Sequence, residues 1–414
     1  MVKKMNKTIK EKLKKIFPKW ILFCYRKISF LLKVFPFYFF RVCPIKNNKI
    51  VFSSYGGKGF GDNCKYIAFE LLNQKEKYDL VWLTNNIDDK NFSKRIRLVK
   101  YNSLKAKFEL TTAKVWIDNI RKDFWTRKRK NQYYIQTWHG NLGPKKCEKD
   151  AESSLNKEYV DLAINDSKMI DLCVSNGKHI SDFYKRAFWY SGKVIECGSP
   201  RNDILINPKN YKNFVRKELG FTDEKICLYA PTFRIQNKTD MFSYKLNEIY
   251  NINYEMLKNS LEEKFGGKWK IAVRLHPNVS ARFNELNLPE FVCNATNYPD
   301  SQELLSECDC VITDFSSIVY DFIFTKKPIF IYASDYEDYI KNQRQLNFQL
   351  EETPFSICKN NEELKKSILN FNLNEYQKNV NSFLKRFGVF ENGNASKIIA
   401  EKIKEITGVK NVNE

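Results

Sequence analysis

The chain has 414 residues, which is too long for one ordinary hydrophobic core and indicates two domains. Hydrophobic residues make up 43% of the sequence and aromatic residues 15%, which excludes a largely disordered chain. The formal net charge of +22 favours anionic partners such as nucleic acid, anionic lipid or a phosphorylated substrate.

Half of that charge lies in residues 1–45, which hold twelve Lys or Arg and one acidic residue, Glu11. The apolar stretches of this segment are interrupted at Arg26, Lys27 and Lys33, so neither reaches the ~20 residues needed to cross a bilayer. Basic residues mixed with Trp, Phe and Leu are typical of a segment that lies in the membrane interface, and each adds about 1 kcal/mol of binding near an anionic leaflet. We therefore predict that residues 1–45 bind an anionic membrane surface; a helix packed on the body is the alternative.

The eleven cysteines indicate a reducing compartment. Cys308 and Cys310 are too close for an ordinary disulfide, and several others lie inside apolar runs, as expected of buried thiols. No CxxC pair supports a zinc site. Together with the basic N-terminal segment, this predicts a peripheral protein on the cytoplasmic face of the cell membrane.

Short apolar segments separated by helix-length spacers recur along the body and predict parallel strands. In the first half they cover residues 49–57, 79–84, 97–99, 114–118 and 133–136, with a helix expected over 63–73. In the second half they cover residues 225–230, 269–275, 310–313 and 328–332. We predict two Rossmann-like, doubly wound α/β domains at residues 46–210 and 211–390, joined near residues 205–222, with a C-terminal helix or tail at 391–414.

The glycine-rich run 56–61 follows the first predicted strand but matches neither GxGxxG nor GxxxxGK[ST]. Backbone N–H groups in such a loop can hold a phosphate, and a plain turn is an equal alternative.

Polar turns follow the predicted strands, where open parallel sheets bind their ligands. They are TWHG at 137–140, GSPRND at 198–203, APTFR at 230–234, RLHP at 274–277 and TDFSS at 313–317, with Asp321 four residues further on. Each turn alone has a structural explanation. Together they supply two of the three histidines, several arginines that match phosphate oxygens, and a serine pair at a helix start. This combination indicates group transfer from a nucleotide-activated donor.

The ordered set TWHG, GSPRND, YAPTFR, RLHPN and ITDFSSIVYDF resembles the CDP-glycerol glycerophosphotransferase family, enzymes that polymerise teichoic acids; similar domains occur in capsule synthesis. The motifs span residues 134–335. The resemblance implies a GT-B-type fold with the active site in the interdomain cleft. It further implies a CDP-polyol donor, a lipid-linked glycan or polyol-phosphate acceptor, release of CMP and monotopic membrane association.

The resemblance also assigns roles to residues. His139 and His276 match the two essential histidines, with His139 as our choice of general base and the reverse assignment open. The matching donor-binding positions are Gly140, Asn141, Leu142, Gly143, Arg201, Pro231, Thr232, Arg274, Leu275, Ser316, Ser317 and Asp321. The family usually has Thr-Pro after the glycine of the first motif, where this chain has Asn141 and Leu142. His179 matches no motif and is expected to be structural.

No cofactor is firmly implied and the sequence contains no convincing metal cluster, although a loosely held divalent cation stays open. Glycerol phosphate is the favoured group; the alternatives are a CDP-ribitol ribitolphosphotransferase and a sugar-nucleotide glycosyltransferase of the same fold. A nucleic-acid-binding protein is disfavoured, because the charge is concentrated in residues 1–45 and no nucleic-acid motif occurs.

Overall fold

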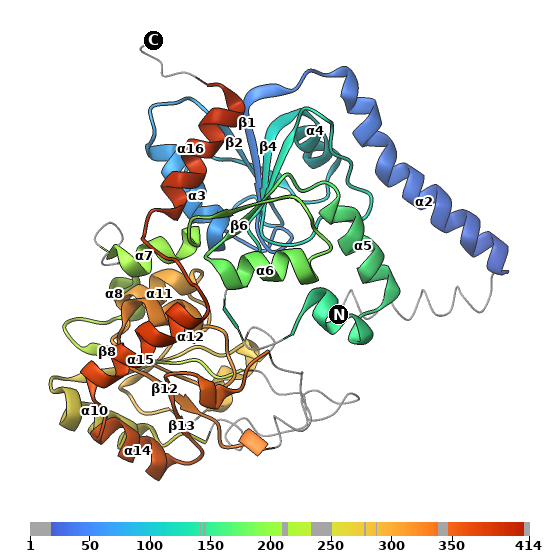
Figure 1. Cartoon of the computed structure of the whole chain (residues 1–414). Coiled ribbons are helices and arrows are strands. Elements are labelled where there is room, and N and C mark those ends of the chain that lie inside the picture. Colours follow the sequence, from blue (N-terminus) through green and yellow to red (C-terminus); the bar gives the residue numbers. More distant parts are fainter. Residues whose placement is uncertain are drawn as a thin grey trace.

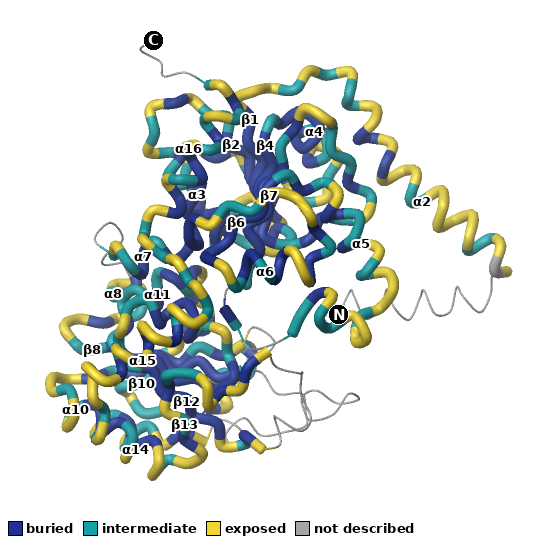
Figure 2. Tube along the Cα trace, in the orientation of Figure 1, coloured by how far each residue is buried: buried dark blue, intermediate teal, exposed yellow. Residues whose placement is uncertain are grey.

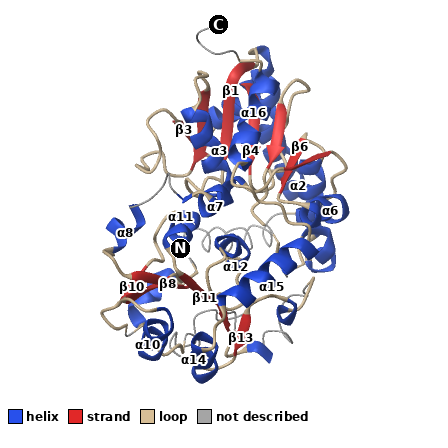
Figure 3. Ribbon diagram, turned by 60° about the vertical axis from the view of Figure 1, so that its left-hand side comes forward, coloured by secondary structure: helices blue, strands red, loops and turns tan. Residues whose placement is uncertain are grey.

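The computed structural model describes residues 18–140, 142–143, 146–208, 214–232, 251–276, 279–286, 288–337 and 347–409. Two parallel sheets, each flanked by helices, lie one above the other in Figure 1 and again in the rotated view of Figure 3. The predicted α/β class with parallel sheets is confirmed.

The first sheet has seven strands in the order β3-β2-β1-β4-β5-β6-β7, and every pairing within it is parallel. Its strands are β1 (Lys46–Ser53), β2 (Asp79–Thr84), β3 (Arg97–Lys100), β4 (Ala113–Asp118), β5 (Tyr133–Gln136), β6 (Leu172–Ser175) and β7 (Lys193–Glu196). The strand order reverses direction between β1 and β4. In a doubly wound sheet such a switch point is where a crevice for ligands opens.

The second sheet has six strands in the order β10-β9-β8-β11-β12-β13, also paired in parallel throughout. Its strands are β8 (Lys225–Tyr229), β9 (Trp269–Val273), β10 (Val292–Asn294), β11 (Cys310–Thr313), β12 (Ile329–Tyr332) and β13 (Ser356–Cys358). The switch point here lies between β8 and β11. The central strands of both sheets, such as β2, β4, β8 and β11, are buried on both faces, which explains their continuous apolar runs.

Several helices begin directly after a residue whose side chain caps them. Ser103, Asn156 and Asn253 accept a backbone N–H from the first turn of α4 (Leu104–Thr112), α5 (Lys157–Ser167) and α10 (Tyr254–Phe265), respectively. The helices are α2 (Lys19–Phe39), α3 (Asp62–Asn73), α4 (Leu104–Thr112), α5 (Lys157–Ser167), α6 (Lys178–Ala187), α7 (Asp203–Ile206), α8 (Phe214–Leu219), α10 (Tyr254–Phe265), α11 (Ser301–Glu307), α12 (Val319–Phe322), α14 (Asn361–Leu369), α15 (Leu373–Arg386) and α16 (Ala395–Thr407). Short 3-10 helices are η1 (Phe40–Val42), η2 (Glu148–Ser154), η3 (Pro200–Asn202), η5 (Ser280–Glu285), η6 (Ile323–Thr325) and η7 (Leu350–Glu352).

The last helix, α16, follows the second sheet in the sequence but packs on the first sheet. Ala395, Ile399 and Ile403 of α16 belong to the same buried cluster as Ile50 and Trp82 of the first sheet. Figure 1 shows α16 beside α3, on the upper half of the molecule. The chain therefore crosses between the two halves twice, first around η3 and again just before α16.

The N-terminal helix α2 leaves most of its surface exposed, as Figure 2 shows. Its last turns are anchored, because Val34 and Phe37 are buried and Phe37 joins the core on one face of the first sheet. None of the described helices is both long enough and apolar enough to cross a membrane. Residues 1–17 of the predicted membrane segment lie outside the described residues.

Candidate active site

His139 lies just beyond β5, at the carboxyl edge of the first sheet. Trp138 before it has a φ of 53°, which turns the chain sharply, and the Trp138 ring lies 4.2 Å from the imidazole. The imidazole Nδ1 is 2.7 Å from the carbonyl oxygen of Asn119, directly after β4. Since a carbonyl oxygen can only accept, Nδ1 carries a hydrogen, which places the lone pair of the neutral tautomer on Nε2.

Tyr55 and Asp62 flank this histidine and were not predicted from the sequence. Both have a left-handed backbone, with φ of 46° and 59°. The Tyr55 hydroxyl donates to Asp62 Oδ2 over 2.6 Å, and the Tyr55 ring lies 5.5 Å from that of His139. Burial favours a neutral Asp62, but the charge of Arg201 and the Tyr55 hydrogen bond outweigh it and lower the pKa of this carboxyl. The site thus holds a fixed negative charge beside the histidine.

Arg201 of η3 connects the two halves of the molecule. Its Nη1 donates to Asp62 Oδ2 and to the carbonyl oxygen of His139, each over 2.9 Å. Its Nη2 lies 3.0 Å from Asp321 of α12, in the second half. Burial opposes the positive charge, but Asp321 and Asp62 more than compensate and raise the pKa of Arg201. The carboxyl edges of the two sheets therefore face each other around this guanidinium.

Asn63 holds two of the predicted motifs together, which the sequence did not indicate. Its Oδ1 accepts the backbone N–H of Arg201 over 3.1 Å, and its Nδ2 donates to the carbonyl oxygen of Trp138 over 3.1 Å. The residue lies in the first turn of α3 and is buried. One buried amide thus sets the relative position of the TWHG and GSPRND turns.

The switch point of the second sheet brings together the turns after β8 and β11. Asp314 accepts the backbone N–H of Thr232 over 2.9 Å and its hydroxyl over 2.7 Å. Pro231 before it is buried, while Ser316 is half-buried and Ser317 is exposed. The predicted donor-binding turns are therefore neighbours at this edge.

The RLHP turn follows β9, the next strand across. The Arg274 guanidinium donates to the carbonyl oxygens of Ala295 and Tyr298, over 3.0 and 2.7 Å, and burial lowers its pKa. Leu275 is buried in the core beneath the turn. His276 at the end of the turn is exposed. In this structure Arg274 orders the loop after β10 and thereby supports the turn that carries His276.

Three other predicted positions, Gly140, Leu142 and Gly143, lie in or just after the turn of the first motif, whereas His179 lies in α6. A Cβ on Gly140 would stand 3.2 Å from the Trp138 indole nitrogen, so the glycine permits a tight approach. Leu142 is fully buried and Gly143 is half-buried, whereas Asn141 lies outside the described residues. His179 packs edge-on against Phe387 with ring centroids 5.1 Å apart, as a structural residue would.

The glycine-rich run after β1 forms a turn. Gly57 has a φ of 82°, and a Cβ there would meet Tyr101 Cβ at 2.8 Å, so a side chain does not fit. Its backbone oxygen accepts the N–H of Asn85 over 2.8 Å after β2. In this structure the turn joins two strand ends.

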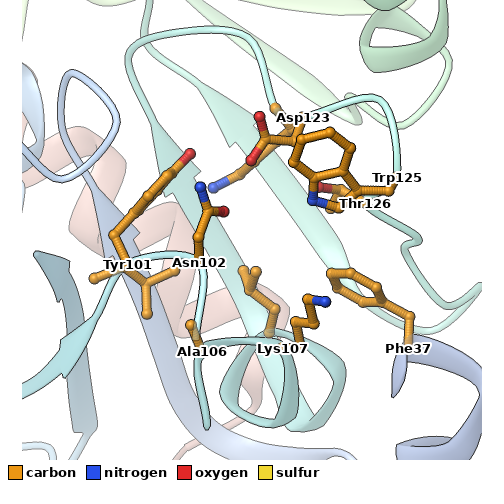
Figure 4. Close-up of a pocket in the computed structure, with 11 residues that line it drawn as sticks. Phe37, Tyr101, Asn102, Ala106, Lys107, Asp123, Trp125 and Thr126 are labelled. Carbon is orange, nitrogen blue, oxygen red and sulfur yellow. The ribbon is translucent and has the colours of Figure 1, made fainter. Parts of the chain in front are cut away.

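Away from the two facing edges, described residues line a small pocket beside α2 and a larger, open one of ≈ 350 Å³ between β13, α14 and α15. No three His, Cys, Asp or Glu residues are grouped for metal binding within the described ranges. A pocket between the end of α2, α4 and the loop after β4 is lined by Phe37, Tyr101, Lys107 and Trp125 (Figure 4). Its volume of ≈ 20 Å³ fits about one water molecule, which excludes it as a donor site.

The chain is similar to known teichoic acid polymerases. The chain is 30% identical to a teichoic acid poly(glycerol phosphate) polymerase of Bacillus spizizenii, covering 92% of this chain and 98% of the relative. It is also 30% identical to a Staphylococcus epidermidis protein of the same description, of which it covers 51%, so the chain spans about half the length of some curated relatives. Ribitol-phosphate polymerases are among the relatives that match at lower identity.

A solved structure of the wall teichoic acid polymerase TagF has a similar fold. Its TM-score is 0.78 at 28% identity, and the match covers 94% of this chain and 97% of that one. The family model for CDP-glycerol:poly(glycerophosphate) glycerophosphotransferase matches residues 36–405. The chain therefore belongs to the CDP-glycerol:poly(glycerophosphate) glycerophosphotransferase family.

Proposed function

We propose that the protein transfers glycerol phosphate from CDP-glycerol to a membrane-linked teichoic-acid-like or capsular polymer and releases CMP. The observation that supports this best is the His139 imidazole, whose Nδ1 is held by the Asn119 carbonyl, so that the lone pair of Nε2 is available for a proton. Family membership supplies the substrate class, and a TagF variant has been solved with CDPG.

In the proposed reaction an acceptor hydroxyl attacks the β-phosphorus of the donor, which bears the glycerol. A new bond forms between that oxygen and phosphorus, the bond from phosphorus to the CMP oxygen breaks, and His139 Nε2 takes the hydroxyl proton. Phosphoryl transfer depends mainly on positioning and charge stabilisation, so no covalent intermediate is needed. His276, at the carboxyl edge of the second sheet, would stabilise the phosphate charge.

The donor would lie between the two carboxyl edges in a GT-B-type arrangement. The nucleotide side would contact Pro231, Thr232, Ser316 and Ser317 at the second switch point, as sites in doubly wound sheets do. Arg201 Nε is buried and has no hydrogen-bond partner among the described residues, which leaves one N–H for a phosphate oxygen. Asp321, Arg274 and the 140–143 turn would complete the contacts, with Leu142 and Leu275 acting through their backbone and packing.

The acceptor would reach the site from an anionic membrane surface bound by α2. Trp20, Ile28, Leu31, Phe35 and Tyr38 recur at helical spacing and are each at least half exposed. Arg26 and Lys33 lie on the other side of the helix, and Lys27, four residues before Leu31, lies at the edge of this stripe. An exposed apolar stripe flanked by basic residues suits a helix lying at the cytoplasmic face, alongside the lipid of the acceptor.

Incubating the full chain with a panel of CDP-polyols and a lipid-linked acceptor tests the substrate. We expect CMP release and a product mass that grows by glycerol phosphate units. The second candidate donor is CDP-ribitol, because ribitol-phosphate polymerases also match this chain. Turnover with sugar nucleotides alone would contradict both.

A further inference from the structure

The two segments by which the chain crosses between its halves are hydrogen-bonded to one another. Asp203 accepts the backbone N–H groups of Ala395 and Ser396 over 3.0 and 2.7 Å, and so caps α16 from the first crossing. Asn207 Nδ2 donates to the carbonyl oxygen of Gly393 over 3.1 Å. Figure 1 shows the red chain that leads into α16 running close to α7. Residues 198–207 and 391–396 therefore form one connected hinge.

Glu391 provides the contacts of this hinge that lie closest to the active site. Its Oε2 accepts the backbone N–H of Ser199 over 3.0 Å, and its Oε1 accepts from Asn202 Nδ2 over 3.0 Å. Gly198 makes this approach feasible, because it has a φ of 95° and a Cβ there would lie 2.7 Å from Glu391 Oε2. The carboxyl group of Glu391 thus binds both ends of the η3 turn.

Arg201 lies between those two ends. Asn202 is fully buried, and its Oδ1 accepts from Gln302 Nε2 of α11 over 3.2 Å, so its amide is held from both halves. With Ser199 and Asn202 fixed, the backbone of η3 has little freedom. The Arg201 guanidinium is thereby preorganised to contact Asp62, Asp321 and the His139 carbonyl oxygen.

We propose that Glu391 is a positioning residue for the transfer reaction, acting through the η3 turn to align Arg201 with His139 and Asp321. This role rests on the proposed function. It differs from a general contribution to stability, because it predicts that Glu391 and Arg201 are energetically coupled in catalysis.

A double-mutant cycle tests that coupling. We expect Glu391→Ala to lower kcat/KM for CDP-glycerol by about tenfold or more in the otherwise unchanged chain. In an Arg201→Lys background, where the aligned guanidinium is already lost, the same change should cost less than about threefold. Equal losses in the two backgrounds would overturn the proposal, since a purely structural effect is additive.

Two further variants complete the design. Glu391→Gln keeps one acceptor oxygen for the Ser199 N–H and should restore kcat/KM to within about threefold of the unchanged chain. Asn202 and Gln302 can both turn their amides, which keeps the bond between them and lets Asn202 Oδ1 accept from the new amide. Glu401→Ala, at an exposed glutamate of α16, is the matched control and should leave kcat/KM unchanged. A Gln variant as inactive as the Ala variant would count against positioning by hydrogen bonds.

Amide hydrogen exchange separates this proposal from the substrate assignment. Glu391→Ala should speed exchange at the Ser199 amide by at least tenfold, whichever donor the enzyme uses. Faster exchange with no turnover of CDP-glycerol by the unchanged chain would refute the donor and retain the hinge. Unchanged exchange at Ser199 would refute the hinge itself.

Discussion

Replacing Arg201 with Met should strongly destabilise the protein. The arginine bridges Asp62 and Asp321 from opposite halves, and the three side chains are only 8%, 5% and 10% exposed. Removing one partner of a buried ion pair costs about 3–5 kcal/mol, because the remaining carboxylates lose their counter-charge. We expect the free energy of unfolding, measured by urea titration without donor, to fall by that amount.

Two companion variants make this result diagnostic. Adding Asp62→Asn and Asp321→Asn to the Arg201→Met variant removes the uncompensated charges and should recover part of the lost stability. Lys157→Met is the surface control, because it breaks the ion pair between Lys157 and Asp161, which are 86% and 48% exposed. It should change the free energy of unfolding by less than about 0.5 kcal/mol. The account of a buried interdomain bridge is refuted if Arg201→Met costs no more than this surface control.

Three other predictions follow from the same structure. Replacing Leu31 and Phe35 of α2 with Glu should reduce sedimentation with anionic vesicles at least tenfold, and equal sedimentation would rule out the exposed stripe as the membrane contact. Thr232→Val removes the hydroxyl bond to Asp314 and should raise KM for CDP-glycerol about tenfold, with kcat nearly unchanged; a lower kcat at constant KM would contradict a donor-binding role. Burial raises the pKa of Glu391 to about 8, although hydrogen bonds from Ser199 and Asn202 oppose the shift. Because the same carboxyl group ionises near pH 4.5 in the unfolded chain, the free energy of unfolding should fall as pH rises from about 4.5 to 8. Unfolding midpoints of the unchanged chain and Glu391→Gln should diverge across that range, and parallel pH profiles would contradict the shift.

The sequence predicted several strands with the correct bounds and missed four others. The bounds predicted for β2, β5 and β11 agree with the structure, because each is an aliphatic or aromatic run that ends abruptly at polar residues. Strands β6, β7, β10 and β13 were not predicted. Strands β10 and β13 have only three residues each, and the charged ends of β7 leave two apolar residues between them.

The candidate site was predictable as a set of turns but not as a network. Strand-end polar turns, together with the family resemblance, gave the candidate residues. The pairing of Arg201 with Asp62 and Asp321 could not be predicted, because these residues are 139 and 120 positions from Arg201 along the chain. The packing of α16 on the first sheet was not predicted either. The apolar face of an amphipathic helix does not specify which of two cores it covers.

The basic N-terminal segment shows another limit of composition. Interrupted apolar runs with basic residues predicted an interfacial helix or a packed one, and the structure contains features of both. The end of α2 at Val34 and Phe37 packs on the body, while residues such as Leu31 and Phe35 remain exposed. The predicted membrane contact therefore stays a proposal that vesicle binding can test.

The most direct test of the central claim is CMP release from CDP-glycerol, in the presence of lipid-linked acceptor, by the unchanged chain and by His139→Ala. The account predicts that the alanine variant loses at least about a hundredfold in kcat while its unfolding midpoint stays close to that of the unchanged chain. His179→Ala, outside the motifs, should keep its activity. CMP release by His139→Ala at the unchanged rate would contradict the account.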